Sequence, residues 1–176
     1  ATGVVARASG LDIDLRRDRP YMAYDQVDFD VVVGSNGDTF DRYLCRMEEM
    51  RQSVRILKQC IDKIPGGPIW VDDRRVQIPE KIDVYSKMEV LIHHFKIFME
   101  GIDVPAGETF TFVEGANGEL GFYLVSRGGP KAWRLHVKSP SLMQFQAYEK
   151  MIKGDKIADA VATLGSVNII AGELDR

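Results

Sequence analysis

The sequence lacks the features that place a chain in several common classes of protein. None of its apolar runs approaches the eighteen or more residues of a membrane span, and no signal-peptide pattern opens the chain. The formal net charge of −3 leaves no dense basic face of the kind that displaces counterions from phosphates. We therefore expect a soluble segment that does not bind nucleic acid.

Cysteine is scarce as well. The two cysteines, Cys45 and Cys60, fall on one predicted helix, where a rise of about 1.5 Å per residue separates them by roughly 22 Å. That distance excludes a disulfide between them. Without further partners they make no metal framework, so the simplest interpretation is two reduced thiols.

The common catalytic motifs are also absent. The chain has no Walker loop, no G-x-G-x-x-G after a strand, no G-x-S-x-G elbow and no H-E-x-x-H. Ser9 or Ser166 would count as a nucleophile only beside a histidine and a carboxylate, which the spacing does not supply. The adjacent His93 and His94 point about 100° apart on a helix and cannot grip one ion. The residues alone therefore predict neither a catalytic group nor a metal site.

What the sequence does contain is enough apolar material for a core, 45% of its 176 residues. The strongest helix signal runs from Asp41 to about Ile64, with Asp38 or Thr39 as its cap and Pro65–Pro68 as its stop. Its apolar residues recur at steps of three and four, which predicts a core-facing stripe: Tyr43, Leu44, Met47, Met50, Val54, Leu57, Ile61 and Ile64. Replacement of Leu57, a central residue of the stripe, by alanine should lower the free energy of unfolding by about 2–5 kcal/mol.

Charged residues occupy the rest of that helix surface: Arg42, Arg46, Glu48, Glu49, Arg51 and Arg55. Arg46 with Glu49 and Glu48 with Arg51 have the spacing of weak surface pairs. Two interpretations stay open, a solvated charged face or a set of arginines that meets an acidic partner.

Before this helix, residues 1–20 show no sustained period and are interpreted as a loop, and Val27–Val33 (VDFDVVV) is predicted to form a strand. After it, residues 69–81 form an extended connection. Ser86–Glu89 fits an S-x-x-E capping box and opens a second helix that Gly101 closes. The apolar stripe of that helix comprises Met88, Leu91, Ile92, Phe95, Phe98 and Met99.

The clearest strand signal follows, TFTFVE, the tip GANG and ELGFYLVS, with WRLHVK as a third strand that carries a structural His136. Asn117-Gly118 favours a tight hairpin turn. One face of this meander is apolar and should be covered by helices: Phe110, Phe112, Phe122 and Leu124. The chain ends with a helical stretch after Ser139-Pro140, and then an Asp155-capped helix with inward residues Ile157, Ala158, Val161 and Leu164.

These elements predict an α+β fold, a helix-bundle core with a small antiparallel β-meander. The expected boundaries are residues 1–37 for a loop and strand, 38–101 for two bundle helices, 108–138 for the meander, and 141–176 for the C-terminal helices and tail.

The order of the segments also resembles that of a known family. GVVARASG, DLRRDRPYMAYDQVDFDV, GSNGDTFDRYLCRMEEMRQS, LIHHFK, PAGETFTFVEGANGELGFYLVS and KIADAVATLGSVNIIAGELDR together resemble the carboxy-terminal part of the 49-kDa subunit of respiratory complex I. That subunit is related to the large subunit of nickel–iron hydrogenases. The resemblance covers essentially the whole chain, and it implies a hydrogenase-large-subunit-like bundle.

The resemblance implies a subunit of proton-translocating NADH:ubiquinone oxidoreductase that forms part of the quinone-reduction cavity, beside the subunit with the terminal iron–sulfur cluster. Electrons would arrive through FMN and iron–sulfur clusters held by partner subunits, with no cofactor bound by this chain. The expected location is the matrix side of the mitochondrial inner membrane or, alternatively, the cytoplasmic side of a bacterial plasma membrane.

Carried over residue by residue, the quinone contacts fall on Asn168 and Ile170. Members of the family usually carry aspartate at the position of Asn168 and a bulky aromatic at that of Ala171. Asparagine keeps an acceptor and adds a donor, which puts a proton-transfer role at 168 in doubt. Hydrogenases ligate their metals with cysteines near this terminus, and residues 153–176 contain none, so a nickel–iron site is excluded.

The family's subunit is more than twice as long as this chain. Its amino-terminal half has no counterpart here, so that half, as a separate chain or as the rest of a longer one, is an expected partner together with the iron–sulfur and membrane-arm subunits. Two other interpretations remain: a structural assembly subunit that does not contact quinone, and an independent soluble binding domain that folds as a monomer.

Overall fold

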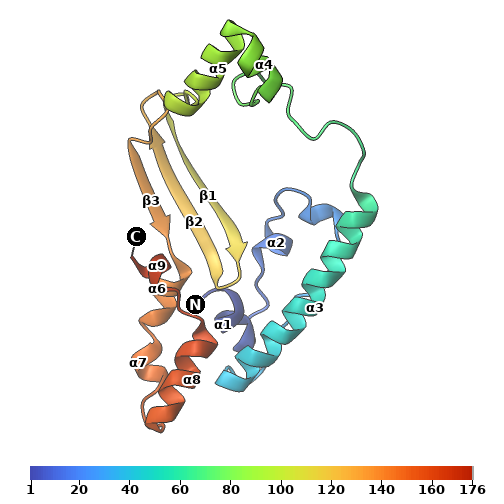
Figure 1. Cartoon of the computed structure of the whole chain (residues 1–176). Coiled ribbons are helices and arrows are strands. Elements are labelled where there is room, and N and C mark those ends of the chain that lie inside the picture. The colour runs from blue at the N-terminus through green and yellow to red at the C-terminus, as the bar shows by residue number, and fades with distance from the viewer. Residues whose placement is uncertain (176) are drawn as a thin grey trace. The chain divides into compact units, whose positions relative to one another are not determined.

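The computed structural model describes residues 1–175 and has the predicted α+β class (Figure 1). Its elements in chain order are α1 (Gly3–Ala8), α2 (Leu15–Asp18), a 3-10 turn (Tyr24–Gln26), α3 (Thr39–Lys63), α4 (Lys81–Ser86), α5 (Met88–Met99), β1 (Gly107–Gly115), β2 (Gly118–Ser126), β3 (Arg134–Lys138), α6 (Pro140–Phe145), α7 (Tyr148–Met151), α8 (Ile157–Val167) and α9 (Ala171–Leu174).

The chain forms two compact units. The first comprises residues 1–64, 111–122 and the described residues from 137 onward, and the second comprises 65–110 and 123–136. The strands form one sheet in the order β1-β2-β3, which confirms the predicted meander. None of the helices within residues 1–175 is both long and apolar enough to span a membrane.

The core of the first unit is built around α1. Val4, Val5 and Ala8 are buried together with Cys45 of α3 and Val167 of α8. The expectation of a loop over residues 1–20 is therefore wrong. A helix of six residues is too short to display a 3.6-residue period, so its sequence carries no recognisable signal.

Two glycines bring α1 onto the tip of the hairpin between β1 and β2. Gly3 has φ +63°, and a Cβ there would lie 2.5 Å from the Cα of Gly118. No side chain fits in that space, and L residues rarely adopt that backbone. The two-residue turn itself is Ala116–Asn117, and the positive φ falls on Gly118 rather than on Asn117.

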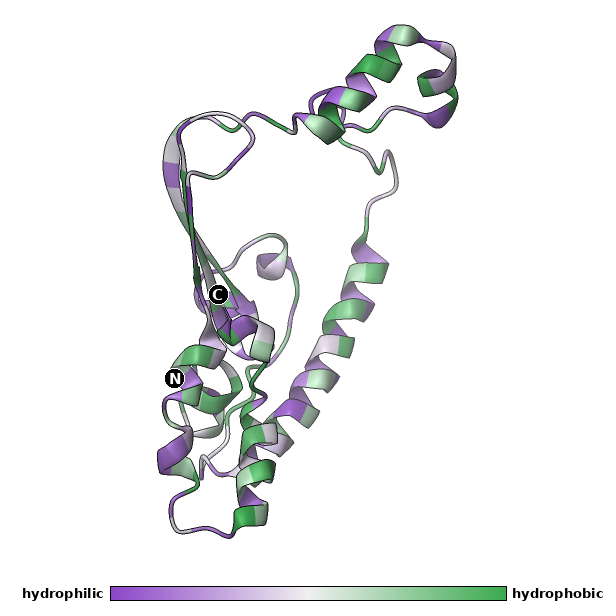
Figure 2. Cartoon of the chain, turned by 60° about the vertical axis from the view of Figure 1, so that its left-hand side comes forward, coloured by the Kyte–Doolittle hydropathy of each residue, from purple (hydrophilic) through white to green (hydrophobic). Residues whose placement is uncertain are grey.

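Helix α3 has the predicted ends but presents the opposite face inward. The Asp38 carboxylate accepts a hydrogen bond from the Asp41 amide at 2.7 Å, which confirms the cap. The residues that α3 buries are Asp41, Arg42 and Cys45. Figure 2 shows hydrophobic residues recurring along this helix, and within this chain most of that stripe is exposed: Tyr43, Leu44, Met50, Val54, Leu57, Ile61 and Ile64. The prediction of a core-facing stripe is wrong for this chain by itself.

Most arginines of α3 bind groups of their own chain. They therefore form neither a fully solvated face nor a set that is left for an acidic partner. Arg42 is 4% exposed, and its Nε donates to the Ser166 hydroxyl at 2.9 Å. Arg55 pairs with Asp28 and Asp30. Arg51 forms the predicted surface pair with Glu48, at 2.7 Å.

The segment Val27–Val33 pairs with no strand, so the prediction of a strand there is wrong. It runs along α3, where the amides of Asp28 and Asp30 donate to the side-chain oxygens of Gln59 and Gln52 at 2.9 and 3.1 Å. Glutamine side chains, and not the backbone of a neighbouring strand, accept hydrogen bonds from these amides.

In the second unit, the range predicted as one connection and one helix contains α4 as well as α5. The capping box is wrong, because Ser86 ends α4 and its hydroxyl donates to the Ile82 carbonyl at 2.8 Å. Helix α5 has Lys87 as its N-cap and stops before Gly101, as expected. Its apolar stripe is also exposed: Met88, Leu91, Ile92, Phe95, Phe98 and Met99.

Helix α8 also differs from expectation, both in its N-cap and in the side that it buries. The N-cap of α8 is Lys156, whose amide donates to Asp159, and Asp155 does not cap it. Thr163 and Val167 are its buried residues, whereas the predicted inward side chains of Ile157, Val161 and Leu164 are exposed.

The exposed stripe of α3 makes a specific prediction. Leu57 is 60% exposed, so Leu57→Ala should change the free energy of unfolding of the chain alone by less than about 0.5–1 kcal/mol. Val167→Ala, at a fully buried position, should cost about 1–3 kcal/mol in the same urea titration followed by circular dichroism. In an assembly that covers the stripe, Leu57→Ala should lower the yield of assembled complex. Equal losses for both variants in the isolated chain would contradict the exposed stripe.

Candidate functional site

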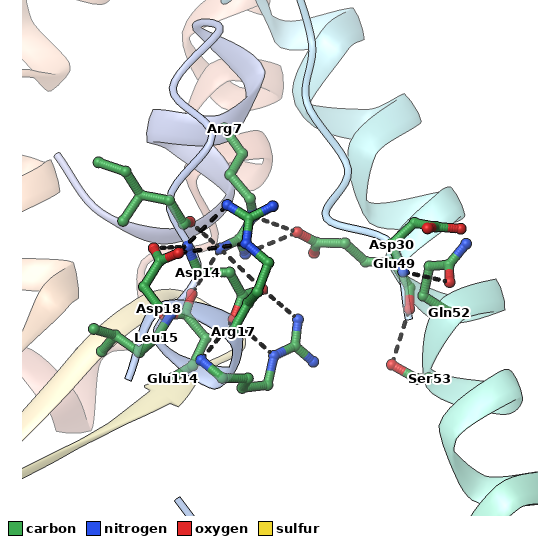
Figure 3. A network of polar contacts seen from close by, with 12 residues as sticks. Arg7, Asp14, Leu15, Arg17, Asp18, Asp30, Glu49, Gln52, Ser53 and Glu114 are labelled. Carbon is green, nitrogen blue, oxygen red and sulfur yellow. Dashed lines mark hydrogen bonds and ion pairs between the residues drawn. The ribbon is translucent and has the colours of Figure 1, made fainter. Parts of the chain in front are cut away.

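A buried ion-pair network joins three segments of the first unit (Figure 3). Arg7, in the last turn of α1, is only 2% exposed. Its Nε donates to Glu49 of α3 at 2.9 Å, and its Nη1 donates to Glu114 of β1 at 2.8 Å and to the Ile13 carbonyl at 3.1 Å. Burial lowers the pKa of Arg7, but the hydrogen bond and charge of Glu114 and the charge of Glu49 raise it above its ordinary value overall. Arg7 is thus held as a cation by two carboxylates.

A second arginine lies beside this network. Asp14 is 1% exposed and is the N-cap of α2, where it accepts hydrogen bonds from the Arg16 amide at 2.9 Å and from Arg16 Nε at 3.0 Å. Burial raises the pKa of Asp14, yet the hydrogen bonds and charge of Arg16 lower it below its ordinary value overall. The Arg16 guanidinium also lies over the Phe29 ring, 4.8 Å from its centroid.

These groups border a cavity of about 420 Å³. Its lining residues are Arg7, Arg16, Arg46, Glu49, Met50, Ser53, Glu114, Gly115, Ala116 and Asn168. Arg7 is matched by Glu49 and Glu114, and Arg16 by Asp14, so the guanidinium of Arg46 is the least compensated charge of the lining. The charged half of this lining can bind polar or anionic groups, and we refer to the site as the polar cavity.

Arg46 itself is incompletely satisfied. Its Nη1 donates to the Ser166 carbonyl, while its Nη2 is buried with no hydrogen-bond partner among the residues described. Burial lowers its pKa, an effect that the nearby charge of Glu49 opposes. The predicted pair of Arg46 with Glu49 is replaced, because Glu49 binds Arg7.

The two predicted quinone contacts lie on the tail and differ in their surroundings. Asn168 is the C-cap of α8 in the left-handed conformation, with φ 59° and ψ 51°, and it borders the polar cavity. Ile170 is 50% exposed and is not among the residues that line this cavity. Between them, Ile169 packs against the buried core. The structure therefore separates the two residues by environment.

The serines that the sequence raised as conditional nucleophiles are engaged otherwise. Ser166 Oγ accepts a hydrogen bond from Arg42 and donates to the Thr163 carbonyl at 2.7 Å, and Ser9 Oγ donates to the Val5 carbonyl at 3.0 Å. These bonds include no histidine, so they make no catalytic triad. Within residues 1–175 no three histidine, cysteine or acidic residues are placed to hold a metal ion. Cys45 is buried, which raises the pKa of its thiol, and Cys60 is exposed.

Sequence reasoning missed the Arg7 network entirely. Arg7, Asp14 and Glu114 lie in segments interpreted as a loop or as the end of a strand, and nothing in a lone charged residue distinguishes a buried pair from a solvated one. The one available signal was a single arginine within the apolar run GVVARA, which must find an acidic partner if the run is buried.

Comparison with known proteins gives a match along the whole chain. A family model described as respiratory-chain NADH dehydrogenase, 49 Kd subunit, matches residues 1–176. An NADH-quinone oxidoreductase subunit from Parvibaculum lavamentivorans is 51% identical over 175 residues, which cover 99% of this chain and 45% of that protein. The corresponding subunit from Pelobacter propionicus is 48% identical, with coverage of 99% and 43%. The chain thus spans less than half the length of these relatives.

The depressed pKa of Asp14 predicts an acid-sensitive core. A carboxyl whose pKa is lower in the folded state contributes stability above its unfolded pKa of about 3.9, and that contribution is lost as the pH falls through the folded pKa. The difference in unfolding free energy between the wild type and Asp14→Asn should therefore shrink as the pH drops below about 4. Urea titrations across this range measure the difference, and a value that stays constant to about pH 2 would contradict the assignment.

Proposed function

Since the chain belongs to the family of the 49-kDa subunit of respiratory-chain NADH dehydrogenase, we propose that it is part of a proton-translocating NADH:quinone oxidoreductase and forms one wall of the quinone-reduction cavity. The observation that carries this proposal is the match over the whole chain, with 51% identity to a bacterial NADH-quinone oxidoreductase subunit. The reaction would be NADH oxidation coupled to quinone reduction, with this chain contributing to the quinone end.

The geometry of the tail supports the quinone contact. At Asn168 the left-handed backbone turns the chain out of α8, and the following two residues are extended before α9 begins. Because side chains alternate along an extended segment, Ile169 packs inward while Ile170 is directed toward the surface. An exposed isoleucine on a fixed segment suits contact with an apolar ring or with the partner that completes the cavity.

The quinone-binding wall would lie on the outer side of the tail rather than inside the polar cavity. Five of the ten residues that line the cavity are arginine or glutamate, and burial of a lipid-soluble ring against them would remove water from their charges. The Arg7 network would then serve as the rigid support beneath the tail.

The proposed partners follow from the exposed apolar faces. Stripes of the size found on α3 and α5 mark interfaces in soluble proteins. The relatives contain more than half their length outside the matched region, and the amino-terminal part of the family's polypeptide is the proposed cover for α3. FMN and iron–sulfur clusters would be held by other subunits, beside a membrane arm that moves protons.

The proposed location is the peripheral arm of the complex, facing the mitochondrial matrix or the bacterial cytoplasm. Both relatives named above come from bacteria, which favours the second location. A second candidate function is structural assembly without quinone contact, favoured by the exposed apolar stripes of α3 and α5, which fit contacts with other parts of a complex.

Footprinting of the tail separates these two candidates. In the assembled complex, bound quinone-site inhibitors should protect residues 164–172 from covalent labelling, because one wall of their site is the tail. Labelling of the same complex without inhibitor serves as the reference. An unchanged pattern at the tail with inhibitor bound would favour the purely structural role.

A matched pair of substitutions tests the same wall. Ile170→Met keeps the volume nearly constant and should leave stability within about 1.5 kcal/mol, yet alter quinone affinity or inhibitor sensitivity. Ile169→Ala removes a core contact and should weaken folding, with quinone kinetics little changed in the complex that still assembles. If both variants act only through the amount of complex, Ile170 is structural and the quinone assignment is wrong.

A further inference from the structure

The tip of the hairpin between β1 and β2 is fixed directly against the tail. Asn117, in the turn, is 6% exposed, and its backbone carbonyl accepts a hydrogen bond from Gln144 Nε2 at 2.6 Å. Gln144 is itself buried in α6 and also donates to the Thr2 carbonyl at 3.0 Å. On the other side Gly3 and Gly118 are in close contact. The tip therefore has little freedom to shift.

A carboxylate sets the orientation of the Asn117 amide. Glu173, in α9, accepts one hydrogen bond from the hydroxyl of Ser141 and another, at 3.4 Å, from the backbone amide of Ser141. The group of Asn117 that faces this carboxylate is the donor, Nδ2, which lies 3.5 Å from Glu173 Oε2. The amide oxygen of Asn117 is thereby turned away from Glu173.

The amide oxygen of Asn117 faces Asn168 and determines which end of the Asn168 side-chain amide points toward it. Asn117 Oδ1 accepts a hydrogen bond from Asn168 Nδ2 at 2.7 Å. The backbone of Asn168 is held as well, because its amide donates to the carbonyls of Leu164 and Gly165, both at 3.1 Å. Among residues 1–175 no donor is bonded to Asn168 Oδ1, and the residue is exposed. Asn168 therefore offers an acceptor to whatever binds beside it.

We propose that Asn117 is a positioning residue that fixes this polarity, so that the tail recognises the hydroxyl of a reduced quinone in preference to the carbonyl of the oxidised form. The inference rests on the proposed quinone contact at Asn168. A quinol O–H donates to Asn168 Oδ1, whereas a quinone carbonyl would place two acceptors opposite each other with no proton between them. The tail thus favours binding of the quinol, the product of the reaction, through one hydrogen-bonded series: Ser141, Glu173, Asn117 and Asn168.

The experiment compares the two redox forms in the assembled complex, without NADH and under anaerobic conditions. A labelled quinone-site inhibitor is displaced by a short-chain ubiquinone or by its quinol, and the ratio of the two dissociation constants is measured. The wild type should favour the quinol. Asn117→Ala lets the Asn168 amide turn over, which should reduce that preference about threefold to tenfold, the value of one neutral hydrogen bond.

Three further variants keep the test specific to positioning. Asn168→Ala should lose the same preference, and adding Asn117→Ala to it should change nothing more, because the two residues act through one contact. Asn36→Ala is the matched control, since Asn36 bonds Asp41 and not the tail.

Each outcome decides the inference. If Asn117→Ala weakens both ligands equally, or lowers only the amount of complex, the positioning role is overturned while the quinone site stands. Glu173→Ala, which removes the orienting carboxylate, should lower the preference in the same way and replaces Asn117→Ala if that variant fails to assemble. If neither redox form displaces the inhibitor, the proposed function itself fails.

Discussion

The first unit depends on the guanidinium of Arg7. It carries a positive charge into a nearly water-free position, where an unpaired charge would cost several kcal/mol, and the two carboxylates that compensate it come from α3 and β1. Three segments that lie far apart in sequence must therefore meet at one place for any of them to be stable there. The tip of the hairpin, α1 and the first half of α3 are held together by that requirement, and the tail packs on the result.

This requirement also explains why α3 has its polar side inward. Arg42, Arg46 and Glu49 face the rest of the unit, where Arg42 and Arg46 bind Ser166 and Glu49 binds Arg7. The apolar stripe is left outward, and α5 in the second unit has the same property. Two long helices with exposed apolar faces are typical of a polypeptide that completes its core with another part of the same protein or complex. The coverage of less than half of the relatives' length agrees with this interpretation.

The tail combines a rigid backbone with a directed polar group. Asparagine tolerates the left-handed conformation at 168 better than most residues, and its side chain is oriented by Asn117. An ionised aspartate at this position would have no hydrogen to donate to Asn117 Oδ1. The amide is therefore compatible with its neighbour here, and the donor that asparagine adds is used inside the protein rather than toward a ligand.

The sequence by itself determined the elements with a long or local signal: α3 with its Asp38 cap, the end of α5 before Gly101, the three strands and the α+β class. Period, cap and turn chemistry act between near neighbours, so one chain contains all the information for them. Only the tertiary structure decided which side of α3 is buried, that Gly3–Ala8 is the central helix of the core, and that Val27–Val33 pairs with glutamines instead of a strand. It also decided the candidate site, because Arg7, Glu49 and Glu114 become one network only when segments 42 and 107 residues apart come together. Burial of a charge depends on partners supplied by the fold, and no local pattern encodes them.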